Sequence, residues 1–212
     1  MAVGRDTAPA GMTKTDTPAG KDPRVAEVLD FWFGPKGSAE RGRPRACWFV
    51  KDAAFDETIR ARFLTLWETA SRAELDAWRT QLPSALALVI MLDQFSRNLF
   101  RGDPRSFSQD GRALAVAKHM VEEGFDQDML AVERWFVYLP FEHSESTPDQ
   151  QRSLELFGNL SADPDSASAI DYARRHHDVI RRFGRFPHRN EILGRPSTPE
   201  ELAFLQEPGS RF

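Results

Sequence analysis

The chain has 212 residues and a formal net charge of −4, and 41% of its residues are hydrophobic and 11% aromatic. This length and composition predict one packed domain, and the negative charge disfavours a dedicated nucleic-acid binder, which carries a basic face. No apolar run approaches the roughly 18 residues of a membrane span. The single cysteine, Cys47, excludes an internal disulfide. Residues 1–21 lack the apolar core of a secretion signal and are rich in Gly, Ala, Thr and Pro, so we expect a disordered tail and a cytoplasmic protein.

Helix signals begin directly after this segment. Asp22 precedes Pro23, the pattern of an N-cap followed by proline in the first turn, and Gly34 is a plausible helix end. Asp52 is placed to cap a second helix. Its apolar residues recur at three- and four-residue spacing: Phe55, Ile59, Phe63, Leu66, Trp67 and Ala70. A third helix is expected from Pro83 through residue 95. It is apolar almost all round, which predicts the central helix of the core.

The second half of the chain continues the helical pattern. Apolar stripes are formed by Leu114, Ala117 and Val121, and by Val132, Trp135, Phe136 and Leu139. Pro140 is expected to end the second of these helices, and capping boxes are expected at 147–150 and 198–201. A long helix should follow Asp163 and end at Gly184. No stretch alternates like a strand, so residues 22–212 are predicted to form one all-α domain of about eight or nine helices, packed as antiparallel pairs in a tetratricopeptide-like manner.

Three polar clusters interrupt these apolar helices. The first contains Asp93, Gln94, Arg97, Asn98 and Arg101. Asp93 and Arg97 are four residues apart, so on a helix they face the same side and can pair. The same spacing between Arg97 and Arg101 would place two guanidinium forks on one face, which is a good receptor for carboxylate or phosphate. The alternative is an ion pair that only covers the end of the core helix.

The second cluster follows Pro140 and contains Glu142, His143 and Glu145. A histidine flanked by carboxylates can act as an acid or base near neutral pH, so these three residues are the candidate catalytic groups. The cluster lacks the Glu-x-x-His and His-Glu-x-x-His spacings of metal sites, so we expect no metal and no cofactor. Its residues could also do no more than cap neighbouring helix ends.

The third cluster is the segment FGRFPHRNEILGR, residues 183–195, together with His176 on the preceding helix. Its candidate ligand-binding residues are His176, Arg185, His188, Arg189 and Asn190. Because the arginines alternate with aromatic and aliphatic residues, part of the segment should be buried, and buried arginines need acidic partners. The candidates are Asp93, Glu142 and Glu145. The three clusters are therefore predicted to converge at one end of a helical bundle, with Arg97, His143 and Arg189 lining a shared site.

These motifs in their order resemble a known family. VLDFWFG, LALVIMLDQFSRNLFRG, FVYLPFEHSES and IRRFGRFPHRNEILGR followed by STPEELAFL resemble the bacterial domain of unknown function family 924, over residues 25 to about 206. The resemblance implies an all-helical fold related to tetratricopeptide-like helix pairs, and it implies no function. Ser96 departs from the proline that relatives often carry.

Two function classes remain open from the sequence. The first is an enzyme or binding protein for a small anionic molecule, with Arg97, Arg101 and Arg189 as the anion receptor and His143 as the acid–base group. The alternative is a module that binds a partner protein or peptide in a groove between helix pairs, near the Gly- and Arg-rich loop at 34–46. A network that only locks helix ends together is a third possibility. We expect neither nucleic acid nor membrane as a partner.

Overall fold

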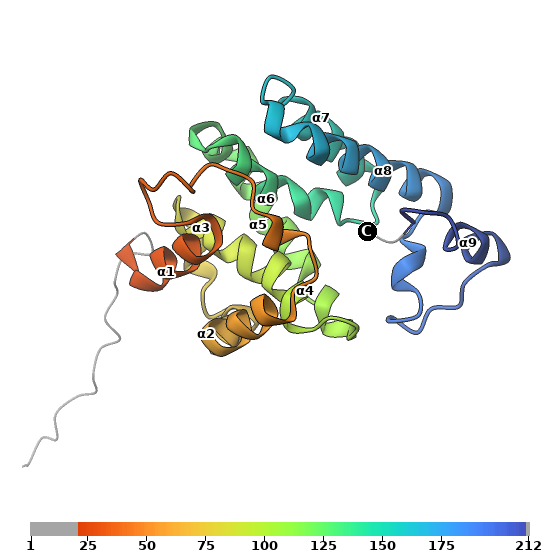
Figure 1. Cartoon of the computed structure of the whole chain (residues 1–212), viewed down its shortest axis with the longest axis horizontal. Coiled ribbons are helices and arrows are strands. Elements are labelled where there is room, and N and C mark those ends of the chain that lie inside the picture. The colour runs from red at the N-terminus through yellow and green to blue at the C-terminus, as the bar shows by residue number, and fades with distance from the viewer. Residues whose placement is uncertain (1–20, 211–212) are drawn as a thin grey trace, which may run out of the picture.

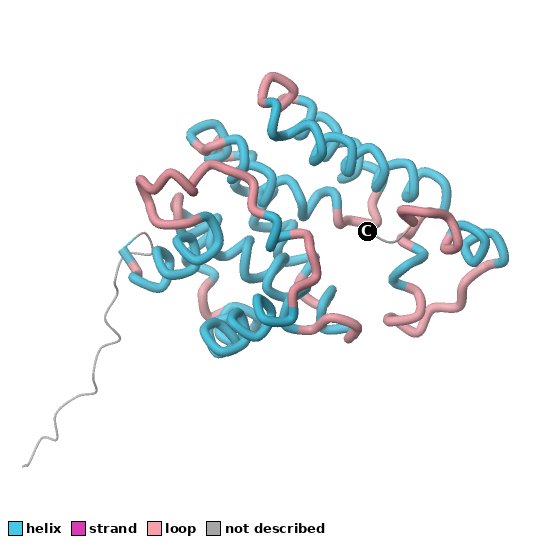
Figure 2. The backbone as a smooth tube through the Cα atoms, viewed as in Figure 1, coloured by secondary structure: helices cyan, strands magenta, loops and turns pink. Residues whose placement is uncertain are grey.

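The computed structural model describes residues 21–210, and all regular structure within this range is helical (Figures 1 and 2). The α-helices are α1 (Pro23–Phe33), α2 (Ala53–Ser71), α3 (Ser84–Val89), α4 (Ser96–Leu99), α5 (Asp110–Glu122), α6 (Ala131–Glu142), α7 (Thr147–Gly158), α8 (Ala167–Phe183) and α9 (Pro199–Phe204). The predicted disordered tail falls, except for Lys21, outside the described residues. No helix between residues 21 and 210 is long and apolar enough to cross a membrane.

Several helix boundaries follow the predicted capping residues. The Asp22 carboxylate accepts a hydrogen bond from the backbone N–H of Arg24 at 3.0 Å, and Asp52 caps α2 in the same way. The capping box of Thr198 and Glu201 opens α9. Helix α8 ends at Gly184, whose φ of 70° lies in the left-handed region that glycine adopts without strain. Local sequence therefore sets these ends, as predicted.

The third helix of the chain is the centre of the core. Helix α3 continues through a π-helical segment, Ile90–Phe95, into α4, and every residue from Ser84 to Asp93 is buried. Helices α1, α5 and α6 pack around α3. Helices α7 and α8 then run side by side as a pair that extends the bundle beyond α6 (Figure 1). The all-α prediction and the central position of this helix are confirmed.

Pro140 was expected to end its helix, and that prediction is wrong. Helix α6 continues to Glu142, and the backbone N–H of His143 bonds to the carbonyl of Leu139 at 2.8 Å. A proline loses only its own N–H bond, and in the last turn of a buried helix tertiary packing can outweigh that loss. The consequence is that Glu142 and His143 are held by helical geometry rather than by a loop.

Two further local predictions need correction. Residues 147–150 do not form a capping box, because Ser146 occupies the N-cap of α7 and makes no side-chain cap. The Gln150 amide instead donates to the carbonyls of Glu142 and Ser144, at 2.6 and 2.7 Å, and so ties α7 to the end of α6. The buried stripe of α5 is centred slightly away from the predicted one. It consists of Ala113, Val116, Ala117 and Met120, while the predicted Leu114 and Val121 are partly buried against the same core.

Candidate functional site

The buried carboxylate of Asp93 and the partly buried ring of His143 form a hydrogen-bonded pair. One carboxylate oxygen of Asp93 lies 2.7 Å from Nδ1 of His143, and the Gln94 amide donates to the other oxygen at 2.6 Å. Asp93 comes from the π-helical segment, a widened turn that often occurs at functional sites. Burial alone would raise the pKa of the Asp93 carboxyl, but the charges of His143 and Arg97 and its hydrogen bonds outweigh burial and hold that pKa well below its usual range. The carboxylate is therefore ionised.

Arg97 links this pair to a second carboxylate. Its Nη2 lies 3.5 Å from Asp93, and its guanidinium bonds both oxygens of Asp110 at 2.8 and 3.1 Å. Arg189, from the third sequence cluster, reaches the same Asp110 at 3.1 Å. Both guanidinium groups also lie over the ring of Phe107, at 5.0 and 4.6 Å from its centroid. Two arginines and two aspartates thus form one continuous network.

The two arginines in this network differ in their electrostatics. Burial lowers the pKa of Arg97, but Asp110 and Asp93 outweigh it, and the net shift is upward. Burial and the charge of Arg97 lower the pKa of Arg189 to about 10, and its Nε is buried with no hydrogen-bond partner among residues 21–210. Arg189 is therefore the less completely neutralised of the two.

Glu142 and His176 form a second buried pair beside the first. His176 Nδ1 donates to the carbonyl oxygen of Tyr172 at 2.9 Å and lies 3.0 Å from Glu142 Oε1, and its ring centroid is 6.2 Å from that of His143. Burial and the nearby Asp93 charge raise the pKa of the Glu142 carboxyl well above its usual value. Burial and the neighbouring His143 lower the pKa of His176 well below its usual value. The pair is therefore neutral, with the proton on the carboxyl group.

Two residues of the first cluster point to a different place. Helix α4 ends at Leu99, so Arg101 does not continue the face that carries Arg97. The Arg101 guanidinium and the Asn98 amide both bond Asp56 on α2, at 2.9 and 2.7 Å. The predicted receptor formed by Arg97 and Arg101 is therefore not present, because the helix ends two residues before Arg101.

Three further predicted residues tie the C-terminal segment together. Arg185 bonds both oxygens of Glu201 at 2.6 and 2.8 Å, and the Asn190 amide lies 3.3 Å from the same carboxylate. Glu145, expected beside His143, instead receives two hydrogen bonds from Arg195 at 2.7 and 3.0 Å. Arg185, Asn190 and Glu145 thus hold the segment after α8 in place and do not contact the Asp93–His143 pair. Asp93 therefore orients the His143 ring. Neither Glu142 nor Glu145 makes the contact with His143 that was predicted to set its acid–base behaviour.

His188 lies at the edge of the network, one residue before Arg189. Burial, together with the charges of Arg189 and Arg97, lowers the pKa of His188 to about 3, so its ring is neutral. Arg97, His143 and Arg189 do come together through shared carboxylates, since Arg97 and His143 meet at Asp93 and the two arginines meet at Asp110. They come from three separate parts of the chain.

Comparisons with known proteins agree with this fold. The model of the family described as "Bacterial protein of unknown function (DUF924)" matches residues 28–209. The chain belongs to the DUF924 family. A solved protein of unknown function from Agrobacterium tumefaciens is 40% identical to this chain, with a TM-score of 0.76, and the match covers 87% of this chain and 97% of the other. No curated protein matches.

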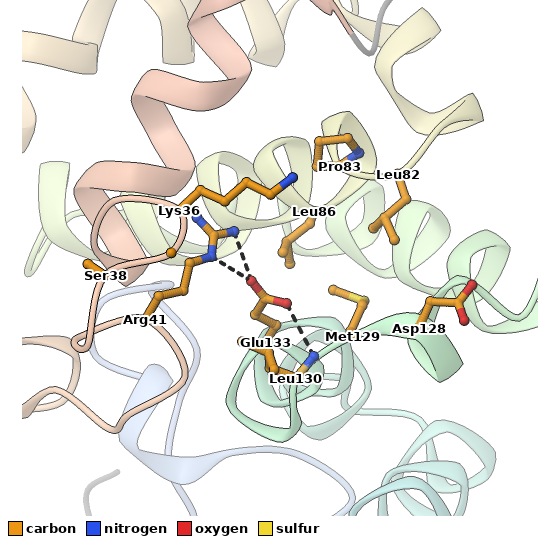
Figure 3. A pocket seen from close by; sticks show the side chains of 11 residues that line it. Lys36, Ser38, Arg41, Leu82, Pro83, Leu86, Asp128, Met129, Leu130 and Glu133 are labelled. Carbon is orange, nitrogen blue, oxygen red and sulfur yellow. Dashed lines mark hydrogen bonds and ion pairs between the residues drawn. The ribbon is translucent and has the colours of Figure 1, made fainter.

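The hollows on the described part of this DUF924 chain include two that could each hold a small molecule. The first, of about 420 Å³, lies between the loop after α1 and the first turns of α3 and α6, and Figure 3 shows its lining. The second, of about 380 Å³, lies beside the C-terminal segment and includes His188. Neither is lined by Arg97, His143 or Arg189. Among residues 21–210, no group of three or more His, Cys, Asp or Glu side chains is arranged to hold a metal ion.

Asp110 and Phe107 are the members of the network that the sequence did not indicate. An aspartate in the first turn of a helix, as Asp110 is in α5, is ordinarily explained by the helix dipole. A signal was nevertheless present, since the buried arginines outnumbered the carboxylates assigned to them. In this DUF924 protein the missing counter-ion for Arg97 and Arg189 is Asp110.

Proposed function

We propose that the Asp93–His143 pair is the acid–base element of a site for a small anionic molecule, and that Arg97 and Arg189 receive the anionic group. The observation that carries the proposal is the difference in exposure within the pair. The Asp93 side chain is 1% exposed and that of His143 is 15% exposed. A buried carboxylate thus orients a histidine that solvent can reach.

The orientation of His143 defines what it can do. Because the ionised Asp93 only accepts hydrogen bonds, Nδ1 of His143 must carry the proton that joins them. In the neutral ring, Nε2 then has a free lone pair, and no described residue hydrogen-bonds to it. A histidine held in this tautomer by a carboxylate can accept and return a proton at Nε2, as in other acid–base sites.

Arg97 and Arg189 supply the anion receptor. Planar guanidinium forks bind carboxylate or phosphate with two hydrogen bonds each, and here both forks meet at one carboxylate, Asp110. The side chains of Asp110 and Arg97 are each 20% exposed, whereas that of Arg189 is 7% exposed, so solvent reaches the network at the Arg97–Asp110 contact. An anionic substrate would bind where Asp110 now contacts the two guanidinium groups.

The proposal is tested by long-range proton–nitrogen NMR of the histidine rings, with inorganic phosphate and then acetate as probes. We expect neutral His143 to be protonated at Nδ1, and the probes to shift the signals of His143 and the Arg97 guanidinium saturably. His119, on α5 beside Phe125, is the internal control and should not shift. A His143 ring protonated at Nε2, or probe shifts equal to those of His119, would contradict the proposal.

A further inference from the structure

The hollow between α3 and α6 is separate from the Asp93–His143 network and has the features of a binding site. Its apolar wall is formed by Leu82 and Leu86 on one side and Met129 on the other (Figure 3). Its volume of about 420 Å³ falls within the roughly 300–1,000 Å³ typical of ligand pockets. Such pockets combine apolar walls with a few placed polar groups, and the polar groups here fall into two kinds.

The first kind is already paired and forms a fixed frame. Arg41 bonds Glu133 at 2.9 Å, and the second oxygen of Glu133 accepts the backbone N–H of Leu130 at 3.3 Å. Arg41 also bonds the carbonyl of Gly34 at 3.4 Å and so ties the loop after α1 to the start of α6. Arg41 also pairs with Asp30 at 3.3 Å, so its charge is fully paired and it contributes shape rather than a free charge to the hollow.

The second kind consists of polar groups that have no partner in the described part of the chain. Lys36 and Asp128 line the hollow, and neither forms an ion pair with any residue between 21 and 210. Figure 3 shows the Lys36 ammonium over Leu86, whereas the Asp128 carboxylate lies at the far side, beyond Met129. The hydroxyl oxygen of Ser38, also in the lining, is buried without a hydrogen-bond partner in the described part of the chain. A buried hydroxyl without a partner is costly unless something binds it.

We propose that this hollow binds a small zwitterion with an apolar body, its carboxylate at Lys36 and its amine at Asp128. The apolar body would replace water against Leu86 and Met129, and each terminal charge would gain a charge-assisted hydrogen bond. The two free charges have opposite signs, so a ligand that carries only one charge leaves the other side chain without a partner.

The test uses the full chain and compares ligands that differ only at their ends. The methyl signals of Met129 and Leu86 are followed by NMR during titration with the ω-amino derivatives of butanoate, hexanoate and octanoate. Unsubstituted alkanoates and alkylamines of the same lengths are titrated in parallel. We expect one of the zwitterions to bind at least about tenfold more tightly than both single-charge analogues of its length, because only the zwitterion satisfies both side chains.

Two variants then assign the ends. Lys36→Gln should reduce the affinity of the best zwitterion to that of the matching alkylamine and leave the alkylamine unchanged, and Asp128→Asn should do the converse with the alkanoate. Arg181→Gln and Asp178→Asn, which neutralise an exposed ion pair on α8, are matched controls and should change nothing. Equal affinity for all three ligand types, no saturable shift at either methyl group, or equal losses in the control variants would each overturn the proposal.

Discussion

Asp93 accepts its hydrogen bond from His143, whereas Glu142, the residue directly before His143 in the chain, faces His176. Two adjacent residues at the end of α6 therefore serve two different acid–histidine pairs. The pKa of the Asp93 carboxyl is lowered and that of the Glu142 carboxyl is raised, so one buried acid is ionised and the other is protonated and neutral. When their surroundings move the pKa values of two neighbouring carboxyl groups apart in this way, one can serve as an acid and the other as a base.

Arg97→Gln should destabilise the protein strongly. The change leaves Asp93 and Asp110 without their shared guanidinium, and removing one partner of a buried ion pair typically costs about 3–5 kcal/mol. Arg101→Gln is the matched control, because it breaks a pair with Asp56 nearer the surface, where such pairs contribute about 1 kcal/mol or less. The free energy of unfolding of each variant is measured in urea.

Sequence alone does not distinguish Arg97 from Arg101. Both belong to the first polar cluster, and both were predicted to bind an anion. A loss for Arg97→Gln no larger than that for Arg101→Gln would mean that the network through Asp110 contributes little to folding.

Much of the fold was predictable because its causes are local. Asp22, Asp52 and Thr198 cap the helices that they were expected to cap, since a capping contact spans only two or three residues. The apolar helix after Pro83 could be placed in the core from composition alone. The helix end predicted at Pro140 is wrong because the tertiary packing of α6 outweighs the one hydrogen bond that proline loses. No local sequence pattern indicates that packing.

The partners of the polar residues were less predictable. The pairing of Asp93 with Arg97 was expected from helix periodicity and is found in the structure. The contact of Arg189 with Asp110 spans 79 residues, and no local signal selects Asp110 among the many carboxylates of the chain. Arg101 pairs with Asp56 because α4 ends at Leu99, a boundary that depends on tertiary packing. The polar clusters could therefore be predicted from the sequence, whereas their ion-pair partners depend on the tertiary fold.

Glu142→Gln should change how stability depends on pH. In the unfolded chain a glutamate titrates near 4.3 and a histidine near 6.5, so between these values the chain holds one proton, on His176. The folded pair also holds one proton there, on Glu142, and it contributes no pH dependence. Above pH 6.5 the unfolded pair holds none, so stability falls as pH rises toward the raised pKa of Glu142.

Glutamine at residue 142 removes the folded-state proton. The folded variant then holds none while unfolded His176 holds one, so its stability falls as pH drops below 6.5, by up to about 1.4 kcal/mol per pH unit. Urea unfolding from about pH 5 to about pH 8 should therefore show a slope that differs from that of the unchanged protein. Adding His176→Gln should remove the difference. Parallel curves for the unchanged protein and the single variant would contradict the neutral Glu142–His176 pair.

Glu201→Gln should loosen the C-terminal segment without disturbing the Asp93–His143 pair. Glu201 accepts hydrogen bonds from Arg185 and from the backbone N–H of Thr198, and these contacts lower its carboxyl pKa to about 2. Neutralising it weakens each bond to the C-terminal helix. Amide hydrogen exchange should accelerate in α9, whereas exchange in the π-helical segment Ile90–Phe95 should be unchanged. Faster exchange in both would show that the two networks are coupled.

Asp110→Asn should strengthen the binding of external anions between Arg97 and Arg189. The substitution keeps the side-chain shape but removes the charge that neutralises Arg97 and Arg189, so the ligand-free variant should be less stable. An added anion can then take the place of the lost carboxylate. At a concentration of ten times its Kd, it should recover about 1.4 kcal/mol. Thermal unfolding in phosphate or acetate, compared with sodium chloride at equal ionic strength, measures this recovery.

Asp56→Asn, which leaves Arg101 without its partner, is the control and should gain much less, because one guanidinium near the surface offers a weaker receptor. A gain in Asp110→Asn no larger than in this control would mean that the two arginines serve only to join helices.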